Sequence, residues 1–141
     1  MRRDLKHLSI DLGDVRIGLA TSDIMGIIAT GLETYKRVDP DKDVDYIAKL
    51  VKDLGVGVVV IGLPVNMDGS SGERVQKAKE FGELLSQKIE AKIDYQDERL
   101  TTVTSERMLI EAGVRREKRK QVIDKIAATI ILQTYLDCHA R

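Results

Sequence analysis

The run from Val56 to Ile61 is the feature that most restricts the fold of this chain. It contains four valines, one isoleucine and one glycine, without the alternation of a strand that has one face in water. Such a run is typical of a strand buried on both faces, at the centre of a parallel sheet that helices cover on each side. The run therefore predicts an α/β fold.

Four further strands are predicted around this central one. The segment from His7 to Leu12 alternates between apolar and polar residues, and Gly13-Asp14 then signals a turn. The segment from Arg16 to Ser22 is interpreted as the returning strand of a hairpin. Two more strands are expected around residues 31–37 and 91–96.

Helices are predicted between these strands. Asp39-Pro40 is a typical helix start, an acidic N-cap followed by proline, and Gly55 ends that helix. Ser70-Ser71-Gly72-Glu73 matches a capping box and opens a second helix. Two more helices are expected, over residues 102–112 and 119–138.

The order of these elements predicts one α/β domain over residues 1–141. The first three strands form an antiparallel meander in a five-stranded mixed sheet, the last two are parallel, and helices cover both faces. In such sheets, function gathers at the carboxyl ends of the central strands. Asp11 ends the first strand, and Asp97-Glu98 end the last one.

Composition excludes some classes of protein. Lys and Arg number 23, Asp and Glu also 23, and this balance argues against a protein that only binds polyanions non-specifically. The single cysteine, Cys138, cannot form an internal disulfide, which fits a reducing compartment. No apolar run approaches about 18 residues, so we expect a cytoplasmic protein without a membrane span.

Three acids fit metal-dependent cleavage of phosphodiester bonds. This chemistry needs carboxylates from different elements around one point, with Mg²⁺ or Mn²⁺ as hard, oxygen-preferring cations. Asp11 and Glu98 are candidates at strand ends, and Asp124 is a third, on a helix face that includes Ala127 and Ala128. Each acid also has an ordinary interpretation, as a turn or cap residue, a surface ion pair or a helix-dipole partner.

Four blocks of sequence resemble one family, in the right order. They run from Ile10 to Asp23, from Gly62 to Gly69, from Asp97 to Thr102 and from Asp124 to Ala128. Together they resemble the YqgF family, the RuvX-like branch of the RNase H-like nucleases, over nearly the whole chain. The resemblance implies an RNase H-like fold and a nuclease that matures the small-subunit ribosomal RNA precursor. An older interpretation of the same family is Holliday-junction resolvase.

The resemblance also assigns the acids. It implies that Asp11, Glu98 and Asp124 are the catalytic metal ligands, with Asp97 uncertain, since successive strand residues face opposite sides. Lys125 stands where the family often has a small residue, and we interpret it as a tolerated surface change.

Candidate substrate-binding residues surround these acids. Arg16 contacts a phosphate in one interpretation and forms an ion pair with Asp14 or Asp11 in the other. The basic run from Arg115 to Lys120 precedes Asp124 by about one helical turn and is expected to contact phosphates. The alternative is that it is a solvated helix start. The full set of candidates is Arg16, Asn66, Asp68, Gly69, Arg99, Arg115, Arg116 and Lys118.

The substrate is expected to be nucleic acid, either precursor RNA or branched DNA, and the protein a monomer or homodimer. One rival interpretation is an actin-like or sugar-kinase-like phosphate binder, which would need a second domain. Another is a ribosome-maturation or nucleic-acid binding factor with little catalysis of its own, an alternative that the neutral net charge leaves open.

Overall fold

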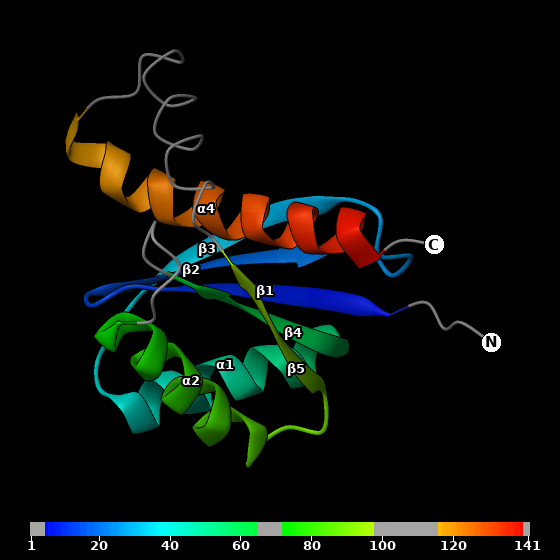
Figure 1. The fold of residues 1–141 in the computed structure, drawn as a ribbon, viewed down its shortest axis with the longest axis horizontal. Helices are drawn as coiled ribbons and strands as arrows, with labels where there is room; N and C mark the ends of the chain where they lie inside the picture. The colour runs from blue at the N-terminus through cyan, green and yellow to red at the C-terminus, as the bar shows by residue number, and fades with distance from the viewer. Residues whose placement is uncertain (1–4, 65–71, 98–115, 140–141) are drawn as a thin grey trace.

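Five strands form one mixed sheet in the order β3-β2-β1-β4-β5 (Figure 1). The structure is a computed structural model that describes residues 5–64, 72–97 and 116–139, with the backbone alone for residues 116–124 and 139. β1 pairs antiparallel with β2 and parallel with β4; β2 also pairs antiparallel with β3, and β4 parallel with β5. The predicted mixed sheet is confirmed. The strands are β1 (Lys6–Leu12), β2 (Arg16–Ser22), β3 (Ala29–Lys36), β4 (Val56–Leu63) and β5 (Lys92–Asp97).

Helices cover both faces of this sheet, as the sequence predicts. α1 (Pro40–Leu54) and α2 (Glu73–Ser86) lie on one face, and α4 (Arg116–His139) lies on the other (Figure 1). The helix expected over residues 102–112 lies outside the described residues. Within the described residues, no helix combines the length and the apolar composition needed to cross a membrane.

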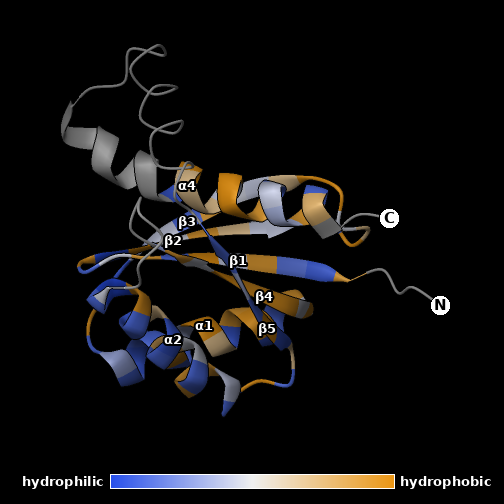
Figure 2. Cartoon of the chain, viewed as in Figure 1, coloured by the Kyte–Doolittle hydropathy of each residue, from blue (hydrophilic) through white to orange (hydrophobic). Residues whose placement is uncertain are grey.

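β4 is buried on both faces, as its continuous apolar run predicts. Val59 and Ile61 belong to the core beneath α1 and α2, whereas Val58 and Val60 pack beneath α4. Figure 2 shows hydrophobic segments in the strands and many hydrophilic residues along α1 and α2. The sheet is therefore the middle layer of a three-layer fold.

The ends of α1 are fixed by local sequence. Asp39 is the N-cap, and its carboxylate accepts a hydrogen bond of 2.9 Å from the amide of Lys42. Gly55 ends the helix with φ of 68°, a left-handed conformation that glycine adopts at little cost. Both predicted ends are confirmed.

The predicted capping box of α2 is wrong. Glu73 is the first helical residue and Gly72 is the N-cap, so Glu73 cannot occupy the third helical position that the motif requires. Gly72 has extended backbone and no side chain to cap the helix, but its carbonyl accepts the first helical hydrogen bond, from Gln76. Glu73 instead pairs with Lys77 one turn later, at 3.3 Å.

Candidate active site at the carboxyl end of the central strand

Asp11 lies near the end of the middle strand, on the face that α4 covers. Leu8 and Ile10 point into the core beneath α1 and α2, and side chains alternate along a strand. Ser9 accordingly points the other way, where its hydroxyl donates a 2.6 Å hydrogen bond to the carbonyl of Ala128 in α4. Asp11 shares the face of Ser9 and is half-buried.

The Ser9–Ala128 hydrogen bond fixes the position of α4 along β1. The rings of His7 and Tyr135 lie 5.9 Å apart, whereas Ser9 contacts Ala128. β1 and α4 therefore run in opposite directions where they pack. Figure 1 shows the same opposite directions. From Ser9 to Asp11 is about 7 Å along the strand, and from Ala128 back to Asp124 is about 6 Å along the helix. Asp11 and helix position 124 therefore lie at the same end of the packed pair.

Arg16 begins β2 on the same face as Asp11. Asp11 pairs in register with Gly18, so Arg16 is its diagonal neighbour, with Cα atoms about 7–8 Å apart. The turn between the two strands is closed by a 2.9 Å hydrogen bond from the Gly13 amide to the Arg16 carbonyl. A Cβ on residue 13 would come within 2.6 Å of that carbonyl oxygen, so this close approach requires glycine.

Asp97 lies on the opposite face from Asp11. It pairs in register with Leu63, and Ile93 and Tyr95 of the same strand pack against the core beneath α1 and α2. Gln96, by alternation, shares the face of Asp11. Asp97 is therefore directed away from the face of Asp11.

Most of the other predicted site residues lie outside the described residues. Among the described residues, no three His, Cys, Asp or Glu side chains gather closely enough to hold a metal ion. Of the three predicted ligands, only Asp11 has a described side chain. The predicted residues that lie outside are Glu98, Asn66, Asp68, Gly69, Arg99 and Arg115.

α4 begins earlier than predicted, at Arg116 rather than Arg119. Arg116 lies eight residues before Asp124 and Lys118 six, which corresponds to about 12 Å and 9 Å along the helix axis. The expected spacing of about one turn holds for Lys120, the last residue of the basic run, but not for these two cations.

The interpretation of Lys125 as a surface change is also wrong. Its side chain is half-buried and crosses β3 at Gly31, where an added Cβ would come within 2.9 Å of the lysine Cγ. The aliphatic part of the Lys125 side chain thus packs on the backbone of β3.

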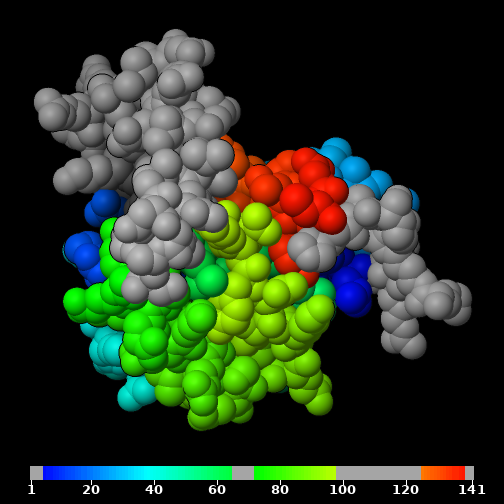
Figure 3. All heavy atoms as spheres, in the orientation of Figure 1, coloured from blue at the N-terminus to red at the C-terminus, as the bar shows by residue number. Residues whose placement is uncertain are grey.

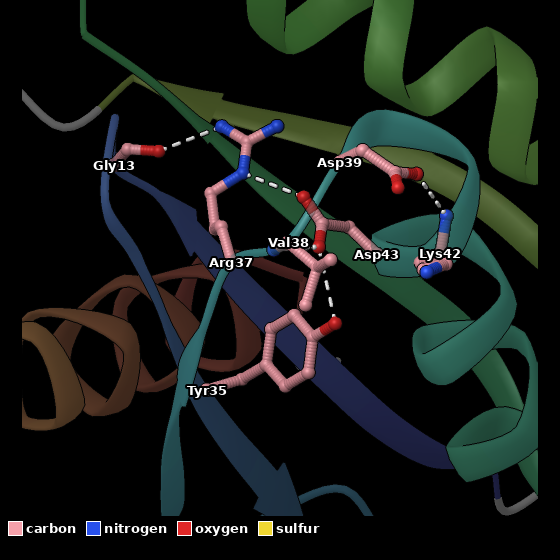
Figure 4. A network of polar contacts seen from close by, with 7 residues as sticks. All are labelled: Gly13, Tyr35, Arg37, Val38, Asp39, Lys42 and Asp43. Atoms are coloured by element: carbon pink, nitrogen blue, oxygen red, sulfur yellow. Dashed lines mark hydrogen bonds and ion pairs between the residues drawn. The ribbon is translucent and has the colours of Figure 1, made fainter.

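A buried ion pair supports the turn that follows Asp11 (Figure 4). Asp43 in the first turn of α1 is fully buried, and the guanidinium of Arg37 donates to it at 2.8 Å. Tyr35 and the amide of Val38 donate to the other carboxylate oxygen, at 3.0 and 2.9 Å. Arg37 also donates to the carbonyl of Gly13 at 2.8 Å, which ties the β1–β2 turn to the start of α1.

The environment of Asp43 favours the charged carboxylate. Burial alone would raise its pKa, but the hydrogen bonds from Val38, Arg37 and Tyr35 together hold the pKa below its usual value of 3.8. The sequence did not identify this pair as part of the site, since Arg37 and Asp43 carry no motif. The local sequence indicates only that Arg37 follows β3 and that Asp43 lies in the first turn of α1, close enough along the chain to form an ion pair.

A second polar contact joins α4 to β5. The hydroxyl of Tyr135, a buried side chain, donates to Asp94 at 2.7 Å. Burial and this carboxylate both raise the pKa of Tyr135 well above its usual range. β5 is an edge strand, and Figure 3 shows it at the surface between α4 and α2. The contact therefore joins the C-terminal half of α4 to the β5 edge of the sheet.

Comparison with known proteins identifies the family. Residues 5–138 match the family model described as "RuvX: Holliday junction resolvase". A protein of Clostridioides difficile (strain 630) is 46% identical over 134 residues, 95% of each chain. A protein of Halalkalibacterium halodurans is 49% identical over 135 residues, 94% of this chain and 96% of that one. Both are named "Putative pre-16S rRNA nuclease". The chain belongs to the RuvX family.

Two solved structures share the fold of this RuvX-family chain. The T. thermophilus RuvC in complex with a Holliday junction substrate has a TM-score of 0.63 at 12% identity, covering 95% of this chain and 94% of that one. The fowlpox virus resolvase in complex with Holliday junction DNA has a TM-score of 0.60 at 11% identity, covering 97% and 100%. The RNase H-like fold that the resemblance implied is thereby confirmed.

Proposed function

We propose that this chain is a metal-dependent nuclease that hydrolyses phosphodiester bonds in the precursor of the small-subunit ribosomal RNA. The observation that carries the proposal is the position of Asp11, a half-buried carboxylate at the end of the middle strand, facing the helix that contains Asp124. The relatives at 46% and 49% identity support the reaction and the RNA substrate by their names. A cytoplasmic location follows from this proposal, because bacterial ribosomes are assembled there.

The acids at this edge suit a hard divalent cation. Carboxylates are the ligands that Mg²⁺ and Mn²⁺ prefer, and Asp11 lies on the face where α4 brings position 124. We assign Asp11, Glu98 and Asp124 as the metal ligands. The opposite orientation of Asp97 favours Glu98 for this role. When bound, the metal would supply an activated water and stabilise charge on the leaving oxygen.

The protein's own cations then hold the substrate. In hydrolysis a water oxygen bonds to phosphorus, the bond to one ester oxygen breaks, and that oxygen takes up a proton. Arg16, on the face of Asp11, is placed to bind a phosphate of the substrate strand. The remaining proposed contacts position the strand without reading its sequence, and they involve Asn66, Asp68, Gly69, Arg99, Arg115, Arg116 and Lys118.

Resolution of branched DNA is the second candidate. The description of the matched family and the fold shared with RuvC support it. A junction requires two symmetric cuts, so this activity needs a homodimer, whereas cleavage of a single RNA strand can be carried out by a monomer.

The test compares wild-type protein, Asp11→Asn and the control Asp53→Asn, an exposed acid on α1. Each is incubated with precursor ribosomal RNA fragments and with a four-way DNA junction, in Mg²⁺ or Mn²⁺ and in chelator. We expect RNA cleavage that falls on the order of 10³-fold or more in Asp11→Asn, since a ligand is lost, and that is unchanged in Asp53→Asn. Junction-only cleavage would transfer the assignment to the resolvase. If the folded wild-type protein cuts neither substrate, the chain is a binding factor.

A further inference from the structure

Two cations lie side by side on the face of Asp11, at the start of β2 and the end of β3. Arg16 of β2 and Lys36 of β3 are partners in register, so their side chains leave the same face directly across from one another. Together with Thr34 and Val15 they line a cavity of about 280 Å³. Lys36 is exposed, and Arg16 and Thr34 are half-buried.

A β-bulge in β3 puts Lys36 on this face. Ala20 pairs with Gly31 but Leu19 pairs with Glu33, so Leu32 is an extra residue in β3. Gly31 faces α4, where it contacts Lys125, and simple alternation would then turn residue 36 to the opposite face. The extra residue inverts the alternation, so Thr34 and Lys36 face the side of Asp11.

The same bulge turns the neighbouring acid away. Glu33 faces α1, where its carboxylate accepts a 2.6 Å hydrogen bond from the hydroxyl of Tyr46. Among the residues that the structure describes, those that line the cavity include two cations and a hydroxyl but no acid.

The cavity lies at a useful distance from the proposed cleavage site. Asp11, Gly18 and Thr34 form one row across β1, β2 and β3, and Arg16 and Lys36 form part of the next row on this face. With strands about 4.8 Å apart, Lys36 is roughly 10 Å from β1. That separation suits a phosphate of the same strand that is not the one being cut.

We propose that Arg16, Thr34 and Lys36 form a subsite for a backbone phosphate of the single RNA strand, beside the scissile phosphate held at Asp11. The proposal rests on the proposed nuclease function and extends it by naming where the flanking strand lies. Two cations and a hydroxyl donor bind the phosphate oxygens, which are present at every nucleotide, so the subsite reads no sequence. The strand accordingly leaves the cleavage site across β2 toward the β3 edge.

The experiment measures binding of a fluorescent single-stranded RNA of about 12 nucleotides to the full chain in chelator, over a series of salt concentrations. Loss of one phosphate contact lowers the slope of log affinity against log salt by about 0.7. We expect Lys36→Gln to weaken binding and lower the slope by that amount, and Lys36→Arg to keep the wild-type slope. Lys49→Gln, which removes an exposed lysine of α1 on the other side of the sheet, should change neither quantity.

Cleavage assays in metal separate this proposal from the nuclease assignment. Lys36→Gln should raise KM with little change in kcat, because a flanking phosphate is held equally before and during the reaction. If Lys36→Gln matches Lys49→Gln in slope while the wild-type protein still cuts RNA, the subsite is overturned and the nuclease assignment stands. If the slope changes but no RNA is cut, the subsite stands and the nuclease assignment fails.

Discussion

The two faces of the sheet bury different kinds of side chain. Among the described residues, thirteen buried apolar residues form the cluster beneath α1 and α2, and eight form the cluster beneath α4. The face beneath α1 and α2 is filled by large side chains such as Leu8, Ile47 and Phe81. The cluster beneath α4 also has large side chains, such as Leu132 and Tyr135, but alanine, glycine and the buried polar residue Ser9 lie on the same face of the sheet.

This difference separates stability from function. Large apolar side chains contribute most of the burial free energy, and among the described residues more of them lie in the cluster with α1 and α2. Small residues let α4 approach the sheet closely, as at Ala128, whose carbonyl accepts the hydrogen bond from Ser9. A single helix thus both closes the second core and contributes to the candidate site.

Leucine-to-alanine changes on the two faces test this separation and have the largest expected effect on the unfolding free energy. Leu85 of α2 and Leu132 of α4 are both fully buried, and each substitution should cost about 3–5 kcal/mol of unfolding free energy. Leu85→Ala should leave kcat of the folded protein unchanged, whereas Leu132→Ala should lower kcat because α4 carries Asp124. Urea unfolding and RNA cleavage measure the two quantities, and an equal effect of both variants on kcat would refute the separation.

Asp43→Ala should cost about 3 kcal/mol, because it leaves the guanidinium of Arg37 and the hydroxyl of Tyr35 without their buried acceptor. The control is Asp45→Ala in the same helix, an exposed acid that pairs with Lys88, for which we expect less than about 1 kcal/mol. Thermal unfolding of both variants checks this. Equal destabilisation would mean that the network of Figure 4 contributes nothing beyond a surface ion pair.

Tyrosine-to-phenylalanine changes compare one hydrogen bond on each face. Tyr135→Phe should cost about 1–2 kcal/mol, since it removes the donor to Asp94 at a buried position. Tyr46→Phe removes a similar bond to Glu33 at a half-buried position, and we expect less than about 1 kcal/mol. Denaturant unfolding gives both values, and the reverse order would show that burial does not set the strength of these bonds.

The smallest expected effect is a difference in acid sensitivity. The pKa of Asp43 is lower in the folded protein than its usual value of 3.8, so its contribution to stability is complete above that pH. The contribution is lost as the pH falls through the lower, folded-state pKa. Unfolding free energies measured between pH 7 and pH 2.5 should therefore decline more steeply below pH 4 for the wild-type protein than for Asp43→Asn. Parallel curves would contradict the lowered pKa.

The sequence predicts those parts of the fold that depend on neighbouring residues. The continuous apolar run of β4, the caps of α1 at Asp39 and Gly55, and the turn at Gly13 are all local signals, and the structure confirms them. The start of α2 was misassigned because Ser70 and Glu73 match the spacing of a capping box, although the helix begins at Glu73.

The candidate site was only partly predictable, because much of it depends on contacts between distant residues. The sequence motif predicts Asp11, and the hairpin predicts that Arg16 lies near it. The placement of Lys36 depends on a β-bulge that no local sequence pattern predicts. The Ser9–Ala128 hydrogen bond joins residues 119 positions apart, and Arg37, which pairs with Asp43, also donates to the carbonyl of Gly13 in the β1–β2 turn. Local sequence patterns do not predict such contacts.

The hydrogen bond between Ser9 and Ala128 has a consequence for synthesis on the ribosome. β1 emerges early and α4 emerges late, so a nascent chain that has completed β1 to β5 still leaves the second face of its sheet uncovered. Val58, Val60 and Ala20 remain accessible to chaperones during that interval. On the proposed function, Asp124 is one of the metal ligands, so a chain released before α4 is made would be inactive as a nuclease.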